Sequence, residues 1–581
     1  MIFHPKPDAH AAGMRPGAAA FLPNRYDVFA FAILFGVFIA AAHGAHVMER
    51  PLAALDFTPV SLEPVNLIPY ALLSTLRMFA AIIASLVFTF VVATLAAKSR
   101  KAELVIIPAL DILQSVPVLG FLSFTVTAFM GLFPGNELGA EMAAIFAIFT
   151  SQAWNMTFAF YQALRTVPKD MQEVARHFRL SGWMRFWRIE APFATPGLVW
   201  NTMMSMSGGW FFVVASEAIT VGNTKVTLPG IGSYLALAIE KQDLVAVAWA
   251  IVAMGVVILI YDQLVFRPIV AWADKFRVEL TAKGEKPTSW VYDVFRHSGA
   301  LRFLGRLFSL WSDWWARTLL TATRRVPPVN GASGAWADGL WIACVAAGAA
   351  WGAWTIVAFV REHLTVSDVG TAFWLGSITF ARVAVLIALA SLIWVPVGVW
   401  IGLRPAVAER VQPLAQFLAA FPANVMFPFF VVVIAGYHLD PNIWLSPLMI
   451  LGTQWYILFN VIAGASAFPN DLLEATTIMK VSRWQWWRDV MLPGIFPYYI
   501  TGALTAAGGS WNASIVAEVV SWGNTRIEAT GLGAYIAKAT EAGDMPRIVL
   551  GISVMSLFVI AFNRLLWRRL YTFAEQRLRL E

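Results

Sequence analysis

Charged residues are scarce in this chain. Of its 581 residues, 13% are Asp, Glu, Lys or Arg, while 59% are hydrophobic. A soluble domain carries about a quarter charged residues, so this composition excludes an ordinary soluble protein and indicates a bilayer as the solvent. The chain also has a single cysteine, Cys344, which excludes an intrachain disulfide.

The sequence patterns of an enzyme are missing as well. The chain contains no Gly-x-x-x-x-Gly-Lys-Ser/Thr phosphate-binding loop, no cluster of metal-ligating residues and no His/Asp/Ser set with catalytic spacing. We therefore expect no catalytic residue, no metal site and no cofactor on this chain. The glycine pairs Gly208-Gly209 and Gly508-Gly509 lie in apolar segments and predict close helix packing.

Long apolar runs are what the chain has in abundance. A helix needs about 20 mostly apolar residues to cross a bilayer. Twelve segments qualify, near 27–47, 71–96, 104–129, 140–163, 195–221, 244–267, 338–360, 375–403, 411–435, 443–465, 495–520 and 547–568. They predict an all-α polytopic membrane protein with about twelve transmembrane helices.

Lys and Arg gather on alternate connections between these segments. They concentrate at 98–101, 165–192, 404–410, 466–493 and beyond 564, whereas the connections near 48–66, 130–139 and 436–442 hold almost none. The positive-inside rule explains the formal charge of +7 without a nucleic-acid partner. It predicts that the basic connections and both termini are cytoplasmic.

The sequence is also duplicated internally. Arg77 matches Arg382 at an offset of 305 residues, and from Trp154, which matches Trp455, the offset holds at 301. Each copy has an even number of spans, so the copies share one orientation and are related by an axis along the membrane normal. We expect two six-helix units, 1–277 and 338–581, with the transport pathway between them.

Residues 278–337 belong to neither copy. Arginines are interleaved with tryptophans there, namely Arg296, Arg302, Arg306, Arg317, Arg324 and Arg325 with Trp290, Trp311, Trp314 and Trp315. A basic face opposite a Trp/Phe/Leu face predicts a helix lying in the cytoplasmic membrane interface. The alternative is a polar linker that returns the chain to the next span.

The connection between the fourth and fifth spans repeats with the same acidic spacing. Asp170 and Glu173 are three residues apart, as are Asp471 and Glu474. This spacing is typical of a capping box, in which the first side chain accepts from the backbone at the helix start and the second reaches back. A short helix is therefore expected to begin there in each copy.

A second short helix is expected to follow. It begins near Ser181 in the first copy and near Ser482 in the second, and Pro192 and Pro493 then fit the first turn of the fifth span. We name residues 168–192 the first hook and residues 469–493 the second hook. Two such amphipathic hooks on the cytoplasmic side suit docking to another protein.

The hooks resemble the EAA loop of binding-protein-dependent ABC importer permeases. That loop has Glu-Ala-Ala, a glycine after three residues, and nine residues later Ile-x-Leu-Pro. The matching residues are Glu173, Ile189 and Pro192, and again Glu474, Val490 and Pro493. The wider pattern, over about 70–277 and 375–577, is similar to the nitrate/sulfonate/taurine-type permeases.

This resemblance implies two tandem type I ABC importer permease units in a bacterial inner membrane. It also implies that each hook docks into a separate ABC ATPase subunit, which binds the ATP and Mg²⁺, and that a periplasmic or lipid-anchored solute-binding protein delivers the solute. The implied docking residues are Asp170, Glu173, Ala175, Arg179 and Pro192, with Asp471, Glu474, Ala475, Lys480 and Pro493. Whether Glu173 and Glu474 cap a helix or contact the ATPase stays open.

The family's loop glycine is replaced here by Arg179 and Lys480. Glycine supplies a left-handed turn between the two short helices. We therefore expect that turn to shift toward Ser181-Gly182 in the first hook and toward Ser482 in the second.

Candidate pathway residues lie in the fifth spans. Charged residues inside a span usually face the bundle interior, and the fifth spans carry one glutamate each, two turns after a tryptophan. The candidates are Trp210, Phe211 and Glu217 in the first copy, with Trp511, Asn512, Ser514 and Glu518 in the second. The glutamates either line a gate or form interhelical hydrogen bonds that join the halves. Arg77 and Arg382 are expected to snorkel at the outer ends of the second spans, or to attract an anion.

Together these features predict the permease of an ATP-driven importer for a small solute, such as nitrate, a sulfonate or taurine. Two alternatives stay open. A secondary transporter with two parallel repeats would move solute without an ATPase. A membrane scaffold would assemble partners and move nothing.

Overall fold

A computed structural model describes residues 24–48, 60–115, 117–178, 180–221, 224–276, 288–307, 309–311 and 335–577. Helices occupy all twelve segments that the sequence predicts as spans. In the first half they are α1 (Arg25–Met48), α3 (Leu67–Lys98), α4 (Arg100–Ser115) with α5 (Val118–Leu132), α6 (Leu138–Arg165), α9 (Ala191–Glu217) and α11 (Leu244–Tyr261). In the second half they are α15 (Ala335–His363), α16 (Val366–Gly402), α17 (Pro405–Ala420) with α18 (Phe427–Gly436), α20 (Ser446–Leu451) with α21 (Gln454–Ser466), α24 (Leu492–Ala517) and α26 (Met545–Phe562).

Shorter helices connect these elements. They are α7 (Lys169–His177), α8 (Gly182–Arg185), α10 (Ile231–Glu240), α12 (Arg267–Ala273) and α13 (Trp290–His297), then α19 (Pro441–Trp444), α22 (Asn470–Ile478), α23 (Arg483–Gln485), α25 (Leu532–Ala542) and α27 (Arg568–Arg577). Within the described residues, six helices are long and apolar enough to cross a membrane, or up to eight if each bent pair is one span. The predicted polytopic helical fold is confirmed.

The third span of each half is broken rather than straight. α4 ends two residues before Pro117, and α17 ends two residues before Pro422. The residue before a proline avoids the helical conformation and the proline itself has no N–H to donate. In the second half the two pieces meet at 76°. The break brings the start of each second piece into the interior of the bundle.

A β-hairpin follows the fifth span in each half. The sequence does not predict these hairpins. β1 (Ala218–Val221) pairs antiparallel with β2 (Thr224–Thr227), and β3 (Val519–Trp522) pairs antiparallel with β4 (Thr525–Glu528). We expected these helices to reach 221 and 520, but they end at Glu217 and Ala517. The residues beyond are mostly β-branched, a type that favours strands.

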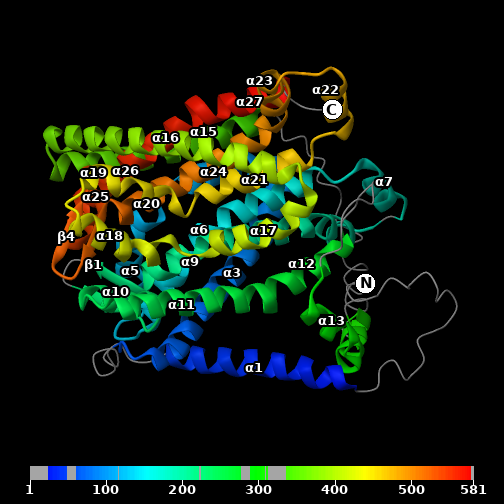
Figure 1. Ribbon diagram of the computed structural model, residues 1–581, viewed down its shortest axis with the longest axis horizontal. Helices are drawn as coiled ribbons and strands as arrows, with labels where there is room; N and C mark the ends of the chain where they lie inside the picture. The colour runs from blue at the N-terminus through cyan, green and yellow to red at the C-terminus, as the bar shows by residue number, and fades with distance from the viewer. Residues whose placement is uncertain are drawn as a thin grey trace.

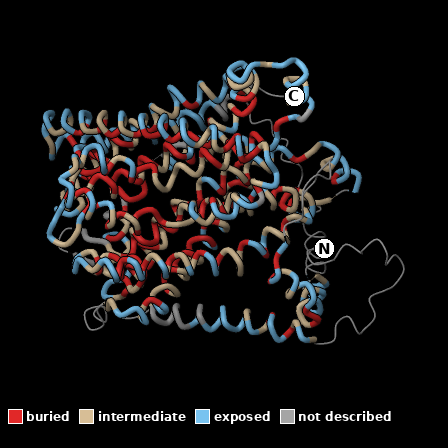
Figure 2. The backbone as a smooth tube through the Cα atoms, in the orientation of Figure 1, coloured by how far each residue is buried: buried red, intermediate tan, exposed pale blue. Residues whose placement is uncertain are grey.

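The bundle has two distinct ends (Figure 1). α7 and α22 lie at one end, here called the hook end, and the hairpins lie at the other, here called the hairpin end. The halves touch at the hairpin end, where the N–H of Gly523 donates to the carbonyl of Ile239 at 2.9 Å. Buried residues fill the interior, whereas most of the described side chains of α15 are exposed (Figure 2). An apolar helix at the periphery of the bundle can be exposed in this way when lipid surrounds the protein.

Candidate functional site

A cavity of about 200 Å³ lies between the two halves. The first half contributes the end of α4, the start of α5, and the middle of α6 and α9. The second half contributes the turn at Pro422, the region from α20 to α21, α24 and the end of α26. Both copies of the duplication therefore build its wall.

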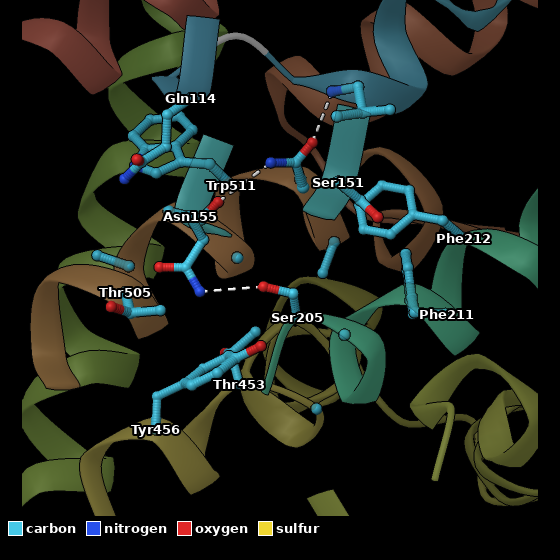
Figure 3. A pocket seen from close by; sticks show the side chains of 18 of the residues that line it. Gln114, Ser151, Asn155, Ser205, Phe211, Phe212, Thr453, Tyr456, Thr505 and Trp511 are labelled. Atoms are coloured by element: carbon cyan, nitrogen blue, oxygen red, sulfur yellow. Dashed lines mark hydrogen bonds between the residues drawn. The ribbon is translucent and has the colours of Figure 1, made fainter. Parts of the chain in front are cut away.

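Polar but uncharged side chains make up part of the cavity wall. Among the residues that the structure describes, no Asp, Glu, Lys, Arg or His lines it. The polar lining residues are Gln114, Thr150, Ser151, Asn155, Ser205, Ser207, Thr453, Tyr456, Thr505, Asn512 and Asn563. Asn155 of α6 donates to the hydroxyl of Ser205 in α9 at 3.1 Å across the first-half wall (Figure 3). Hydroxyl and amide groups both donate and accept hydrogen bonds, so the wall can replace water around a small polar solute.

Aromatic side chains complete the wall. They are Trp154, Phe211, Phe212, Phe421, Tyr456, Trp511, Phe562 and Trp567. The ring of Trp511 is stacked against Phe380 and Phe558, at 27° to each, and is almost fully buried. Such packed rings are rigid, so they fix the shape of the cavity.

Hydrogen bonds cross between the two halves beside the cavity, including one at the break in the third span of each half. The backbone N–H of Val118 donates to the side-chain oxygen of Asn512 at 2.7 Å. The side-chain amide of Asn424 donates to the carbonyl of Phe211 at 3.1 Å. In each case the break in the third span of one half meets the fifth span of the other. The broken spans thus hold the halves together beside the cavity.

Arg77 is the centre of a buried ion cluster in the first half. Its guanidinium contacts Glu141 of α6 at 2.6 Å and Glu217 of α9 at 2.7 Å, and its side chain is fully buried. Ser74 and the N–H of Gly232 also donate to Glu217. A charge this deep in a bundle is tolerated because each charged partner is hydrogen-bonded. The prediction that Arg77 snorkels is therefore wrong.

Arg382 forms the matching pair in the second half with fewer partners. It contacts Glu518 at 2.6 Å, and its side chain is 8% exposed, so this arginine does not snorkel either. Asn442, 301 residues after Glu141, takes no part in an ion pair within the described residues and accepts instead from the N–H of Thr530. In the first half, Arg77 is paired with two carboxylates, those of Glu141 and Glu217. In the second half, Arg382 is paired with one carboxylate, that of Glu518.

Glycines let the chain close over both glutamates. A side chain at Gly230 would lie 2.3 Å from the carboxylate of Glu217, and one at Gly531 would lie 2.2 Å from that of Glu518. Real Cβ contacts are never so short. The glutamates therefore fasten the segment after each hairpin to the second and fifth spans of the same half. They do not join the two halves.

Both hooks form two successive helices as predicted, but the expected caps are wrong. α7 begins after Pro168 and α22 after Pro469, and neither has a side-chain cap. The second helices do begin at the predicted serines: Ser181 accepts from the N–H of Met184, and Ser482 forms a capping box with Gln485. Each continues through a π-helical turn into the fifth span, so Pro192 and Pro493 lie within one continuous helix.

Lys480 itself provides the left-handed turn in the second hook. Its φ is +51°, whereas Ser482 has φ −64°. The expected shift toward Ser482 is therefore wrong, because the backbone keeps the turn at the family's glycine position and accepts a lysine there. Arg179, its counterpart in the first hook, lies outside the described residues.

The hooks expose apolar side chains as well as charged ones. Asp170, Glu173, Asp471 and Glu474 are exposed, whereas Ala175 is buried and Ala475 is half-buried. Around them lie Val174, Phe178, Trp183 and Trp187 in the first hook, and Leu472, Ile478, Met479 and Trp484 in the second. Ile478 and Met479 are 81% and 78% exposed. Exposed apolar groups with a charged rim are typical of a protein-binding surface.

Comparison with known proteins identifies the family. Residues 88–267 and 394–580 each match the binding-protein-dependent transport system inner membrane component family. These two regions make up more than half of the chain. The chain belongs to this family. It is thus a permease with two copies of the family domain, integral to the inner membrane.

Individual relatives match one part of this permease. The nitrate import permease protein NrtB of Leptolyngbya laminosa is 26% identical over 33% of this chain and 66% of its own length. The bicarbonate transport system permease protein CmpB of Synechocystis is 28% identical over 33% of this chain and 65% of its own length. The taurine transport system permease protein TauC of Escherichia coli is 26% identical over 33% of this chain and 67% of its own length. The first two matches span just under two thirds of those relatives.

The pathway residues predicted from the sequence divide into two groups in this permease. Phe211, Trp511 and Asn512 line the cavity. Trp210, Ser514, Glu217 and Glu518 do not. Trp210 is buried with its ring edge-on to Tyr261, and the hydroxyl of Ser514 donates to its own helix at Trp511.

Several residues of the permease's site were missed in the sequence. Glu141 is one of them, although an acidic residue inside a predicted span is itself a signal of a functional or buried polar site. Asn155 and Ser205 were missed because single polar residues in an apolar run have many explanations. Asn424 could have been found from its place just after the proline that breaks the third span.

Proposed function

We propose that this permease is the transmembrane unit of an ATP-driven importer for a small solute. The observation that carries the proposal is the cavity between two family domains whose hooks lie at the same end of the bundle. One chain then supplies both halves that a permease of this kind needs. The pseudo-twofold axis of the duplication passes between the halves, which is where the solute would move.

The hooks are proposed to dock two separate ATPase subunits. Their exposed apolar residues and acidic side chains support this, because such surfaces bury well against a partner groove. Each hook continues into α9 or α24, both of which line the cavity. A movement of a docked ATPase would therefore be passed along one rigid helix to the cavity wall. ATP and Mg²⁺ belong to those subunits in this proposal.

The hook end is proposed to face the cytoplasm. Its connections carry most of the Lys and Arg, in keeping with the positive-inside rule. The two hairpins would then face the periplasm, where a solute-binding protein would release its cargo. Both termini would be cytoplasmic.

A small anion is the proposed cargo. Nitrate, bicarbonate and taurine, which the relatives' names give, all carry oxygens that accept hydrogen bonds. The cavity offers neutral donors such as the amides of Asn155 and Gln114, and Asn563 is a further amide in its wall. Neutral donors hold an anion more weakly than a buried arginine would, which suits a site that must also release its cargo.

Reconstitution tests this proposal. The full chain would be placed in liposomes with a candidate ATPase and a candidate binding protein, and uptake of labelled nitrate, bicarbonate and taurine would be measured with and without ATP. We expect uptake of one of them only with ATP and all components. Uptake driven by an ion gradient without the ATPase would indicate a secondary transporter, and no uptake with full assembly would indicate a scaffold.

A further inference from the structure

Glu190 lies in the π-helical turn between α8 and α9, within the first hook. Its side chain is 7% exposed, and its carboxylate lies 3.1 Å from Nζ of Lys98 and 2.6 Å from Nε of Arg185. Lys98 is the last residue of α3, and Arg185 is the last residue of α8. The carboxylate therefore ties the second helix of the first hook to the end of the second span.

Lys98 also contacts this turn through an aromatic ring. Its ammonium lies 5.0 Å from the ring centroid of Phe186, which is buried and lies edge-on to Phe160 of α6. The side chains of Lys98 and Arg185 are 41% and 36% exposed, so the solution reaches both cations although the carboxylate between them is buried. Dissolved ions can therefore screen this ion cluster from its cationic side.

The second half has apolar residues at all three positions. By the register of the duplication, the counterparts of the charged residues are Leu403, Trp486 and Met491. Met491 is fully buried, and Leu403 and Trp486 pack against the same hydrophobic core. An exposed ion pair in the second hook joins the neighbours Arg488 and Asp489, so it does not connect the hook to another helix. Contacts between apolar side chains do not depend on charge, so the two hooks are held by different forces.

The same exchange occurs at a neighbouring contact of the hook end. In the first half, the hydroxyl of Tyr161 in α6 donates to the carboxylate of Glu103 in α4 at 2.5 Å. The counterparts in the second half, Ile462 and Ala408, belong to one apolar cluster. Two ties that involve a charge in the first half are thus apolar in the second.

We propose that Glu190 is a positioning residue that makes the order of the first hook depend on the ionic strength at the hook end, while the second hook is insensitive to it. At low salt the ion cluster holds α8 and the following turn against α3, and at high salt the screened cations release them. The consequence for transport rests on the proposed function. Coupling to an ATPase subunit through the first hook weakens as salt rises, and coupling through the second is retained.

Hydrogen exchange on the full chain in nanodiscs tests the ordering step. Peptides covering 182–190 and 483–491 are followed in the same molecule, so the second hook is an internal control. Raising KCl from about 0.1 M to about 1 M shortens the Debye length from about 10 Å to about 3 Å. We expect the protection of 182–190 to fall by about tenfold, the scale of two partly exposed ion pairs, and that of 483–491 to stay unchanged.

Three variants separate charge from packing. Glu190→Gln should show low protection of 182–190 at both salt concentrations. Lys98→Leu, Arg185→Trp and Glu190→Met together install the residues of the second half, and this triple variant should regain protection without a salt response. Asp489→Asn removes the exposed carboxylate of the second hook and is the matched control, which should behave as the wild type does.

The proposal is overturned if both hooks lose protection equally with salt, or if Glu190→Gln or the triple variant keeps the salt response of the wild type. ATP-driven uptake by liposomes tests the consequence for transport. The same salt step should slow uptake by the wild type more than uptake by the triple variant, and equal slowing would overturn the link to coupling. Absence of uptake at both salt concentrations would contradict the proposed function instead, which the exchange measurement does not require.

Discussion

The side-chain oxygen of Asn512 accepts a hydrogen bond from the backbone N–H of Val118, which lies 394 residues earlier in the chain. The bond ties the fifth span of the second half to the broken third span of the first. Its counterpart on the other side runs from Asn424 to the carbonyl of Phe211. The duplication therefore yields a pair of similar contacts beside the cavity, made by different residues.

Replacing Asn512 by alanine should weaken the contact between the halves. The Val118 N–H would lose its partner, and an unpaired buried donor costs about 1–3 kcal/mol. We expect a lower melting temperature of the purified permease and slower solute uptake in liposomes. Asn201→Ala is a matched control, because the side chain of Asn201, within the described part of the chain, bonds to Gly197 of its own helix. Equal effects of the two variants would contradict a special role for the bond between the halves.

The two buried arginines should differ in their effect on stability. Arg77→Gln leaves two buried carboxylates without their cation, and breaking a buried pair in this way costs about 3–5 kcal/mol. Arg382→Gln leaves one carboxylate, at a site that is 8% exposed, and should cost less. Thermal unfolding of both variants in the same detergent measures the difference. A larger loss for Arg382→Gln would contradict the asymmetry of the two clusters.

Much of this architecture is readable from the sequence because it depends on periodic apolar runs and on a constant repeat register. Arg77 shows a limit of prediction from periodicity and repeat register. Its place at the end of a span suggested snorkelling, and only the fold brings Glu141 and Glu217, 64 and 140 residues away, onto it. The hairpins were missed for a related reason. Their first strands, Ala218–Val221 and Val519–Trp522, are largely apolar like the helix before them. What ends the helix is pairing between strands.

The left-handed turn at Lys480 should tolerate glycine. A residue with a side chain in this conformation is strained by roughly 1 kcal/mol relative to glycine. Lys480→Gly should therefore keep or slightly raise the melting temperature. Lys480→Val should disorder the second hook, because a β-branched residue is a poor fit for positive φ. Co-purification with the ATPase subunit checks both variants, and equal capture of the valine and glycine variants would show that this turn does not shape the docking surface.

Glu474 should act on the partner and not on its own helix. It caps nothing in α22, so Glu474→Gln should leave the melting temperature unchanged. An exposed ion pair contributes up to about 1 kcal/mol, so we expect up to about fivefold weaker binding of the ATPase subunit. Glu362→Gln, at an exposed glutamate in α15, is the control. Unchanged binding with both variants would mean that the charge of Glu474 is not needed for docking.

The central claim is that solute crosses through the cavity between the halves, and Gly508 offers the most direct test. Gly508 lines the cavity, and a Cβ there would meet nothing within 4 Å. Gly508→Phe should fill the cavity without disturbing the fold, whereas Gly370→Phe, at an equally open position away from it, is the control. The measurement is ATP-dependent solute uptake by liposomes holding the permease with its ATPase and binding protein. We predict that Gly508→Phe abolishes uptake while ATPase binding and the melting temperature are retained, and that Gly370→Phe transports normally. Uptake by Gly508→Phe at the wild-type rate would contradict the account.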